Sequence, residues 1–251
     1  MTVMPGSGTP TASEPVAARV ARFGPSERAA HWIHATAFFA LLATGLVLYI
    51  PAFAAAVGDR PLAKAVHLAS AVLWVTGLAV VAVAGDRRAL RRTRRELERF
   101  DADDALWLRG RRAPQGRFNA GQKVHAILQA ALAVLFLVSG TLLWLGERNT
   151  AFRLPGTIAL HDLSMFAALV LVAGHLYLAL VHEATRPALR GMTHGDIEGR
   201  WALEHHAKWT PAERAPATRR VGREQRIAAA AIALAGIALA LALVSDTLGS
   251  G

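Results

Sequence analysis

The stretch that decides the fold is residues 158–182, which read IALHDLSMFAALVLVAGHLYLALVH. Asp162 is the one Asp, Glu, Lys or Arg in this stretch. A hydrocarbon core about 30 Å thick is crossed by about 20 helical residues, so the stretch is long enough to span it. Because backbone groups in lipid must be paired within the segment, the sequence predicts a transmembrane helix here.

Four further apolar blocks contain no Asp, Glu, Lys or Arg: residues 29–50, 65–85, 124–146 and 227–245. Of the 251 residues, 53% are hydrophobic, and their concentration in such long blocks is not typical of a soluble domain. The predicted fold class is an all-α integral membrane protein, with a bundle of four transmembrane helices and a fifth, C-terminal one. The chain has no cysteine, which excludes iron–sulfur clusters, thiolate-bound metals and disulfides within it.

The net charge of +10 is distributed unevenly among the loops. Residues 85–118 hold eleven Arg, and residues 183–226 hold eight Arg and one Lys. Residues 51–64 and 147–157 hold two basic residues each, and none follows residue 226. This alternation is the positive-inside pattern, so the charge indicates membrane topology and no nucleic-acid partner. It predicts a bacterial cytoplasmic (inner) membrane protein whose N-terminus is cytoplasmic and whose C-terminus lies outside.

The helices and loops divide the chain into four predicted parts. Residues 1–21 form an N-terminal segment, rich in Pro, Gly, Ser and Thr, that is predicted to be disordered. Residues 22–210 form the four-helix domain. Residues 211–226 form a basic linker, and residues 227–251 form the additional helix and its tail.

Histidines recur at matching depths in the predicted helices, where ionisable groups are costly and commonly functional. His161 and His175 are 14 residues apart in one helix, so they lie within about 40° of one face and about 21 Å apart along the axis. By the predicted topology, His67 lies at the depth of His161. Either His31 or His34 lies at the depth of His175.

Two histidine pairs at two depths describe two stacked bis-imidazole heme sites inside a helical bundle. A single histidine in a membrane helix is more commonly a packing residue, but four at complementary depths favour heme. A metal transporter would normally need carboxylates inside the helices, and only Asp162 is available. Gly45, Gly77, Gly140 and Gly174 accompany the histidines, either for close helix packing or to make room for a flat macrocycle.

Short motifs surround these histidines and continue into the loops. They are ERAAHW (27–32), VH (66–67), FNAGQK (118–123), LH (160–161), GHLY (174–177), GM (191–192), WA (201–202) and HHAKW (205–209). In them the chain resembles the cytochrome b (gamma) subunit of respiratory, membrane-bound formate dehydrogenase, from Arg22 through Trp209. The RxxHW pattern is shared with hydrogenase cytochromes, so the specificity rests on NAGQK, the histidine spacing and the HHxxW tail.

The resemblance implies four axial ligands for two b-type hemes. His67 and His161 resemble the ligands of the heme near the outer surface. His31 and His175 resemble those of the heme near the cytoplasm, which selects His31 over His34. Five other histidines are expected to have no ligand role: His34, His125 and His182, and, as surface or interface groups, His205 and His206.

The resemblance also implies a quinone site beside the inner heme, formed by Asn119, Gly121 and His175. Gly121 would let a ring approach the backbone, and Asn119 would donate to a quinone carbonyl. Alternatively, Asn119 only caps the third helix. Lys123 is expected to extend its charged end to the interface.

The function implied by the resemblance is electron transfer to menaquinone or ubiquinone in anaerobic respiration. An iron–sulfur (beta) subunit would pass electrons from a molybdenum- or tungsten-containing catalytic (alpha) subunit to this chain, which would not itself oxidise formate. The nearest alternative is the cytochrome b of a nickel–iron hydrogenase or of a related thiosulfate-type reductase. A heme-free membrane transporter or anchor subunit is the alternative from another class.

One segment departs from the family, whose members typically end after the fourth helix and a basic tail. Residues 227–245 add an Ala-rich apolar helix with no ligand-type side chain. It is predicted to pack or to anchor the chain through small residues. The residues expected on its packing face are Ala231, Ala235, Ala238 and Ala242.

Overall fold

The structure, a computed structural model, describes residues 18–210 and 221–249. The expectation of disorder for residues 1–17 therefore lies outside the described residues, as does most of the expected linker. Five described helices are long and apolar enough to cross a membrane: α1 (Pro25–Tyr49), α3 (Arg60–Ala84), α6 (Ala120–Arg148), α7 (Thr157–Leu176) with its π-helical extension η2 (Tyr177–Val181), and α10 (Arg223–Gly249). The predicted class, a multi-pass helical membrane protein, is confirmed.

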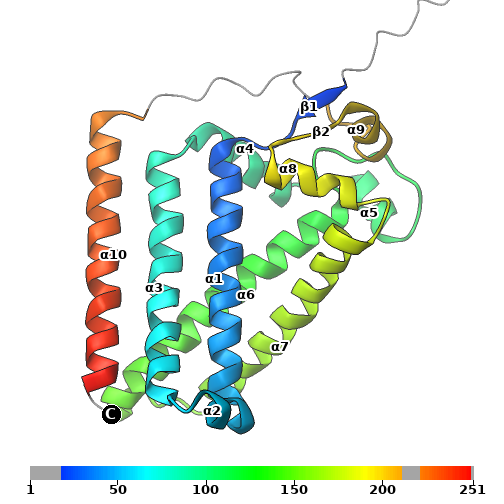
Figure 1. The fold of residues 1–251 in the computed structure, drawn as a ribbon. Coiled ribbons are helices and arrows are strands. Elements are labelled where there is room, and N and C mark those ends of the chain that lie inside the picture. The colour runs from blue at the N-terminus through cyan, green and yellow to red at the C-terminus, as the bar shows by residue number, and fades with distance from the viewer. Residues whose placement is uncertain (1–17, 211–220, 250–251) are drawn as a thin grey trace, which may run out of the picture.

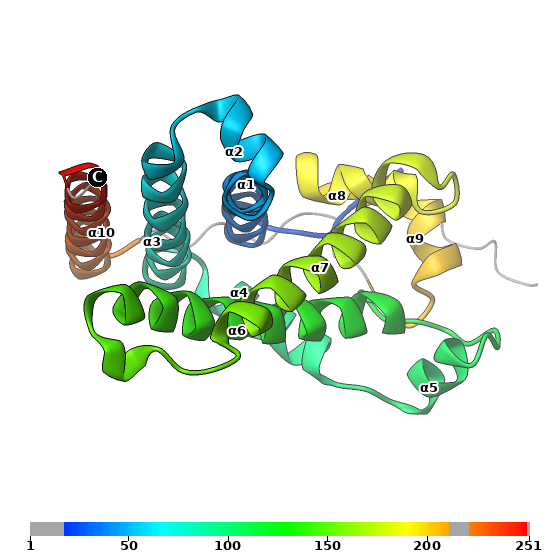
Figure 2. The same ribbon diagram turned by 90° about the horizontal axis from the view of Figure 1, so that it is seen from below.

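The long helices form a row and a tilted pair. In Figure 1 and Figure 2, α1, α3 and α10 stand side by side with α3 in the middle, and α6 and α7 lie tilted against this row. Gly77 permits the close approach of α1 to α3, because a Cβ there would lie 2.9 Å from Ile33 Cγ2. Of the two roles considered for Gly77, close helix packing is the one seen.

Short elements gather at the end of the bundle where α1 and α6 begin, which we term the basic end (top of Figure 1). They are β1 (Arg19–Ala21), α4 (Arg87–Glu98), α5 (Ala102–Leu108), η3 (Arg186–Ala188), α8 (Leu189–Thr193), β2 (Asp196–Glu198) and α9 (Gly199–His205). At the opposite, short-loop end lie α2 (Pro51–Val57) and η1 (Thr150–Phe152). The long helices, which carry the predicted ligand histidines, therefore run between an end with many short elements and an end with few.

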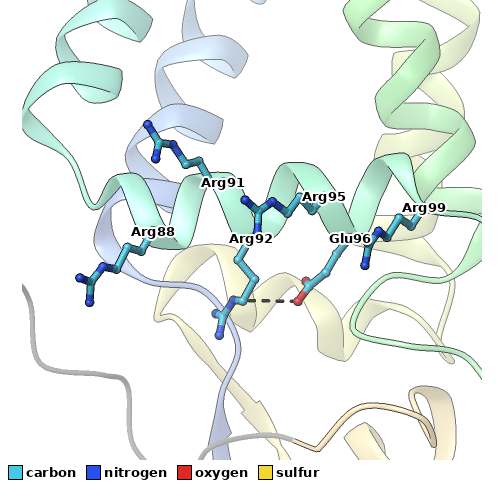
Figure 3. Close-up of a pocket in the computed structure, with 6 residues that line it drawn as sticks. All are labelled: Arg88, Arg91, Arg92, Arg95, Glu96 and Arg99. Atoms are coloured by element: carbon cyan, nitrogen blue, oxygen red, sulfur yellow. Dashed lines mark ion pairs between the residues drawn. The ribbon is translucent and has the colours of Figure 1, made fainter.

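The helix α4 gives the basic end its name. Its N-cap is Asp86, whose side chain accepts hydrogen bonds from the backbone N–H groups of Arg88 (2.9 Å) and Ala89 (3.1 Å). Its side chains surround an open surface hollow (Figure 3). The residues lining that hollow are Arg88, Arg91, Arg92, Arg95, Glu96 and Arg99.

A small antiparallel sheet at the basic end differs from the all-helical prediction. β1 pairs with β2 so that Val20 stands opposite Ile197, and both pack with Trp201 and Ala202 in a buried cluster. Strands of three residues are too short to show the alternation that identifies a strand in sequence. Residues 19–21, placed in the N-terminal segment by the sequence, are thus part of the ordered structure.

The fifth helix packs along α3, but on a different face from the predicted one. Its buried residues are Ala229, Gly236, Ala240 and Thr247, whereas Ala231, Ala235, Ala238 and Ala242 are exposed. A Cβ at Gly236 would overlap the side chain of Thr76 on α3. At the short-loop end Asp246 pairs with Arg148 of α6. The predicted face was wrong because small residues occur all around this helix, so composition alone does not select a side.

Candidate functional site

Four histidines from three helices form two pairs between the row and the tilted helices. The rings of His67 on α3 and His161 on α7 have centroids 6.3 Å apart, with an interplanar angle of 65°. The rings of His31 on α1 and His175 on α7 are also 6.3 Å apart, at 57°. The first pair lies toward the short-loop end and the second toward the basic end. The structure thus brings His67 together with His161, and His175 together with His31, one of the two histidines that the sequence placed at its depth.

The spacing of both pairs fits an iron held between two imidazoles. Bonds from imidazole nitrogen to a transition metal are about 2 Å long, so two imidazoles on opposite sides of one ion place their centroids about 6 Å apart. Neutral imidazole nitrogens are the donors that a b-type heme accepts at its two axial positions. The residues present therefore fit two bis-histidine hemes, one near each end of α7.

The pair at the short-loop end has two hydroxyl partners. Thr44 Oγ1 lies 2.9 Å from His67 Nδ1, and Ser139 Oγ lies 2.8 Å from His161 Nδ1. Each hydroxyl is followed by a glycine that lies beside the same ring: a Cβ at Gly45 would be 3.6 Å from His67 Cε1, and one at Gly140 would be 3.4 Å from His161 Cε1. Because these glycines have no side chain, they leave space beside the two histidine rings.

The pair at the basic end has a third histidine beside it. His125 of α6 stacks on His175, with centroids 5.2 Å apart and planes at 16°. His34, in contrast, lies against Trp74 of α3 at 5.6 Å. His31 is therefore the α1 histidine that faces His175, and His125 is a neighbour of the site that the motifs did not identify. Only its position near the start of a transmembrane helix could have indicated it.

The helix that carries His175 changes form directly after it. Leu176 ends the α-helical part of α7, and residues 177–181 form a π-helical turn. Such turns widen a helix and occur frequently at functional sites. His182 closes the turn, and its Nδ1 lies 3.2 Å from Thr185 Oγ1, away from both pairs.

Asn119 and Gly121 lie at the start of α6, at the basic end. Asn119 Oδ1 accepts from the Gln122 N–H (2.9 Å) and Gln122 Oε1 accepts from the Asn119 N–H (3.1 Å), which is a capping box. A Cβ at Gly121 would lie 3.0 Å from Trp107 Cη2. The aromatic ring that approaches Gly121 is thus Trp107 of α5. Asn119 caps α6, as the alternative interpretation of this residue predicted.

Lys123 is buried, although the sequence suggested an interfacial position. Its Nζ donates to Asp104 Oδ2 (2.6 Å) and to the Arg99 carbonyl oxygen (2.9 Å). The side chains of Lys123 and Asp104 are 10% and 3% exposed. The expectation was wrong because a partner for the ammonium group is supplied by α5, a helix that the hydropathy pattern does not reveal.

Two residues of the first motif bind the end of α8. Arg28 Nε and Trp32 Nε1 both donate to the Met192 carbonyl oxygen, at 3.1 and 3.0 Å. Arg28 Nη1 also donates to the His194 carbonyl oxygen (3.3 Å). A cation is favourable at a helix C-terminus. The ERAAHW and GM motifs are therefore in contact, which anchors the segment after α7 to the turn that bears His31.

A buried ion pair at the basic end was missed by the sequence reasoning. Arg117 Nη1 binds Glu27 Oε1 at 2.9 Å, and the two side chains are 2% and 4% exposed. Arg117 Nε also binds Glu96 Oε2 of α4 at 2.6 Å. Among so many arginines, one that is buried has no distinguishing sign in the sequence beyond its place directly before the FNAGQK motif.

His206 is buried and does not lie at the surface. Its Nδ1 donates to the Gly116 carbonyl oxygen at 2.6 Å, and its ring stands 5.4 Å from Trp201 and 6.3 Å from Trp209. Burial, and after it the positive charge of Arg22, lowers the pKa of His206 to about 3. The ring is therefore neutral, and the HHxxW tail fastens onto the loop before α6.

The fold and the paired histidines define a multi-pass helical membrane protein with two pairs of facing histidine rings between its helices. Residues 22–195 match the family described as prokaryotic cytochrome b561. The chain therefore belongs to the prokaryotic cytochrome b561 family, and membership of a cytochrome b family implies heme b.

Curated relatives support the resemblance seen in the motifs. The chain is 27% identical over 204 residues to the formate dehydrogenase cytochrome b556(fdo) subunit of Escherichia coli K12, covering 76% of this chain and 91% of that protein. It is 25% identical over 203 residues to the formate dehydrogenase cytochrome b556 subunit of Haemophilus influenzae, covering 76% and 82%. A shorter match, 28% over 99 residues, links it to the nitrate-inducible cytochrome b556(Fdn) subunit of Escherichia coli K12 and covers 39% and 45%.

Proposed function

We propose that this chain is the membrane cytochrome b subunit of a formate dehydrogenase complex. Two b hemes bound to it would carry electrons from an iron–sulfur partner subunit, supplied by a molybdenum- or tungsten-containing catalytic subunit, to a membrane quinone. The proposal rests on two histidine pairs, His67–His161 and His31–His175, near the two ends of α7. In each pair the ring centroids are 6.3 Å apart. The named relatives supply the choice of formate as the electron source.

The proposed heme content has a direct test. Purified protein should contain two low-spin b hemes per chain, because two separate histidine pairs each have the spacing for one iron. Pyridine hemochrome analysis against a protein determination measures the ratio. A ratio of one or none in the intact complex would contradict the proposal.

The proposed orientation places the basic end in the cytoplasm of a bacterial cell and the short-loop end outside. The arginines of α4 (Figure 3) contribute to the positive charge that favours this orientation. The His67–His161 pair is then the outer pair and the His31–His175 pair the inner pair. Electrons would enter from a partner at the short-loop end and leave to quinone near the basic end.

The orientation predicts that the C-terminus lies outside, because α10 begins at the basic end and runs to the short-loop end (Figure 1). A reporter that is active only outside the cytoplasm should be active when fused after Gly251. The same reporter fused after Gly110, at the basic end, should be inactive. The reverse result would overturn the orientation.

We place the quinone site at the basic end, at Asn119, Gly121 and His175. The support is the stacking of His125 on His175, which joins the first turns of α6 to the end of α7. The capping bond of Asn119 uses Oδ1, so the amide Nδ2 is left to donate to a quinone carbonyl. Because Gly121 has no Cβ, the ring of Trp107 can lie close to the backbone of α6, where it would form one edge of the site.

Replacing Asn119 separates this role from capping. Asn119→Asp keeps a good cap but loses the amide donor, and Asn119→Ala loses both. Both variants should slow quinone reduction by up to about tenfold, the worth of one hydrogen bond, while the partner subunit still reduces both hemes. Stopped-flow reduction and steady-state quinone assays measure the two steps. Normal quinone kinetics and inhibitor sensitivity in both variants would remove the site from this position.

A further inference from the structure

We propose that Thr44 and Ser139 are positioning residues of the outer heme, which fix the tautomer of its two ligands and lower its reduction potential. The inference rests on the proposed ligation by His67 and His161. It concerns two hydroxyls that belong to neither the motifs nor the ligand set. Each comes from a helix different from that of the histidine it contacts: Thr44 from α1 and Ser139 from α6.

Each of the two hydroxyls donates its proton to a backbone carbonyl oxygen of its own helix. Thr44 Oγ1 lies 2.7 Å from the Ala40 carbonyl oxygen, and Ser139 Oγ lies 2.6 Å from the Leu135 carbonyl oxygen. A carbonyl oxygen can only accept, so the hydroxyl must donate in both contacts. Both are the bond from a hydroxyl to the carbonyl four residues earlier that is common in helices.

A hydroxyl has one proton, and this fixes the direction of its second hydrogen bond. With that proton given to the carbonyl, Thr44 and Ser139 can only accept from the ring nitrogens 2.9 and 2.8 Å away. Nδ1 of His67 and of His161 must therefore carry the ring proton. The lone pair of each neutral ring is then on Nε2, which is the atom left to bind iron.

The two halves of the site share a local pattern, a hydroxyl residue followed by glycine. Thr44 is followed by Gly45, and Ser139 is followed by Gly140, and each glycine lies beside the ring that the hydroxyl holds. The hydroxyl thus fixes one edge of the imidazole, while the glycine keeps space beside another. Because this pattern occurs independently on α1 and α6, we infer that it serves to orient the two histidine ligands.

Among the residues that the structure describes, none supports the inner pair in this way. Within residues 18–210 and 221–249, no hydrogen bond reaches a ring nitrogen of His31 or His175. A hydrogen bond accepted from a ligand's second nitrogen raises the basicity of that ligand, which favours ferric over ferrous iron. The outer heme is therefore biased toward the lower potential, so that electrons entering at the outer surface pass inward to the heme of higher potential.

The test compares Thr44→Val and Ser139→Ala with two matched controls. Thr76→Val and Ser164→Ala each remove a hydroxyl that bonds to a carbonyl four residues earlier, at 2.7 Å in both cases, without touching a ligand. The measurement is a potentiometric heme titration of the intact complex with low-spin EPR spectra. The outer heme is identified by its absence from His67→Ala.

In Thr44→Val and Ser139→Ala the outer heme should be reduced more easily, by up to about tenfold in its ferric–ferrous equilibrium, which is about 59 mV for one electron. The inner heme and both controls should be unchanged. Thr44→Ser and Ser139→Thr, which keep the hydroxyl, should restore the wild-type potential. Loss of the outer heme from Thr44→Val but not from Thr44→Ser would also support the proposal.

Unchanged potential and EPR signal of the outer heme in the double variant Thr44→Val/Ser139→Ala would overturn the inference. So would an equal shift in Ser164→Ala, or loss of the outer heme from both Thr44→Val and Thr44→Ser, because packing would then explain the effect. Failure of the ligand assignment looks different: His67→Ala and His161→Ala would remove different hemes. That result would overturn both the pairing and the role of the hydroxyls.

Discussion

Replacing His67 or His161 with alanine is expected to remove the outer heme and to leave the inner heme bound. The two rings of the outer pair are 6.3 Å apart and lie on α3 and α7, so loss of either would leave the proposed outer heme with a single protein ligand. The inner pair uses a different residue of α7, about 21 Å away along the helix axis. The heme content should therefore fall by about half in either variant.

The experiment has a matched control on α1. His34→Ala removes an intramembrane histidine whose ring faces Trp74, so both hemes should remain. His31→Ala should remove the inner heme instead. Pyridine hemochrome content and redox titration of each purified variant separate the outcomes. Equal loss of both hemes from every substitution, in protein that still assembles with its partners, would show that the rings are not arranged as two independent sites.

The transmembrane helices and the depth of the histidines could be predicted from sequence. Long uncharged blocks have few alternatives in a membrane, and a 14-residue spacing fixes both angle and height on one helix. The choice between His31 and His34 could not be made from spacing, because both lie within one turn of each other. It depends on the rotation of α1 against α3 and α7, which places His34 beside Trp74 and His31 beside His175.

The details of the basic end could not be predicted, because they depend on contacts between segments distant in sequence. Buried Lys123 is paired with a carboxylate from α5, and buried His206 is hydrogen-bonded to the loop before α6. The sequence around Lys123 or His206 contains no motif that would identify these distant partners. The face of α10 was missed for a different reason: an Ala-rich helix offers several similar faces, and only α3 decides which one is covered.

Replacing Arg117 with methionine is expected to cause the largest loss of stability outside the heme ligands. Arg117 and Glu27 form an ion pair of 2.9 Å whose side chains are 2% and 4% exposed. Removing one member leaves the other charge buried without a partner, which costs about 3–5 kcal/mol in such pairs. Arg117 also donates to the Arg22 carbonyl oxygen at 3.0 Å, so a backbone acceptor is left unpaired as well.

The loss should appear first at the inner heme. Glu27 lies in the first turn of α1, one turn before His31, and Arg117 lies just before the cap of α6. Thermal release of heme from the detergent-solubilised complex, followed in the visible spectrum, should start at a lower temperature in Arg117→Met. The inner heme should be lost before the outer one. Lys64→Met, which breaks an exposed pair with Glu147, should change stability by about 1 kcal/mol or less.

A double-mutant cycle tests whether the unpaired charge is the cause. If Arg117→Met is harmful because Glu27 is left charged and buried, then adding Glu27→Gln removes that charge and should restore much of the stability. If the effect instead comes from lost packing of the Arg117 side chain, the second substitution should add to the damage. Recovery of stability in the double variant cannot be complete. Glu96 of α4 loses its ion pair with Arg117 Nε, 2.6 Å long, whenever Arg117 is replaced. Suppose that Glu27→Gln restores much of the stability lost in Arg117→Met and that the inner heme is retained. The role of Arg117 would then be to neutralise the buried charge of Glu27.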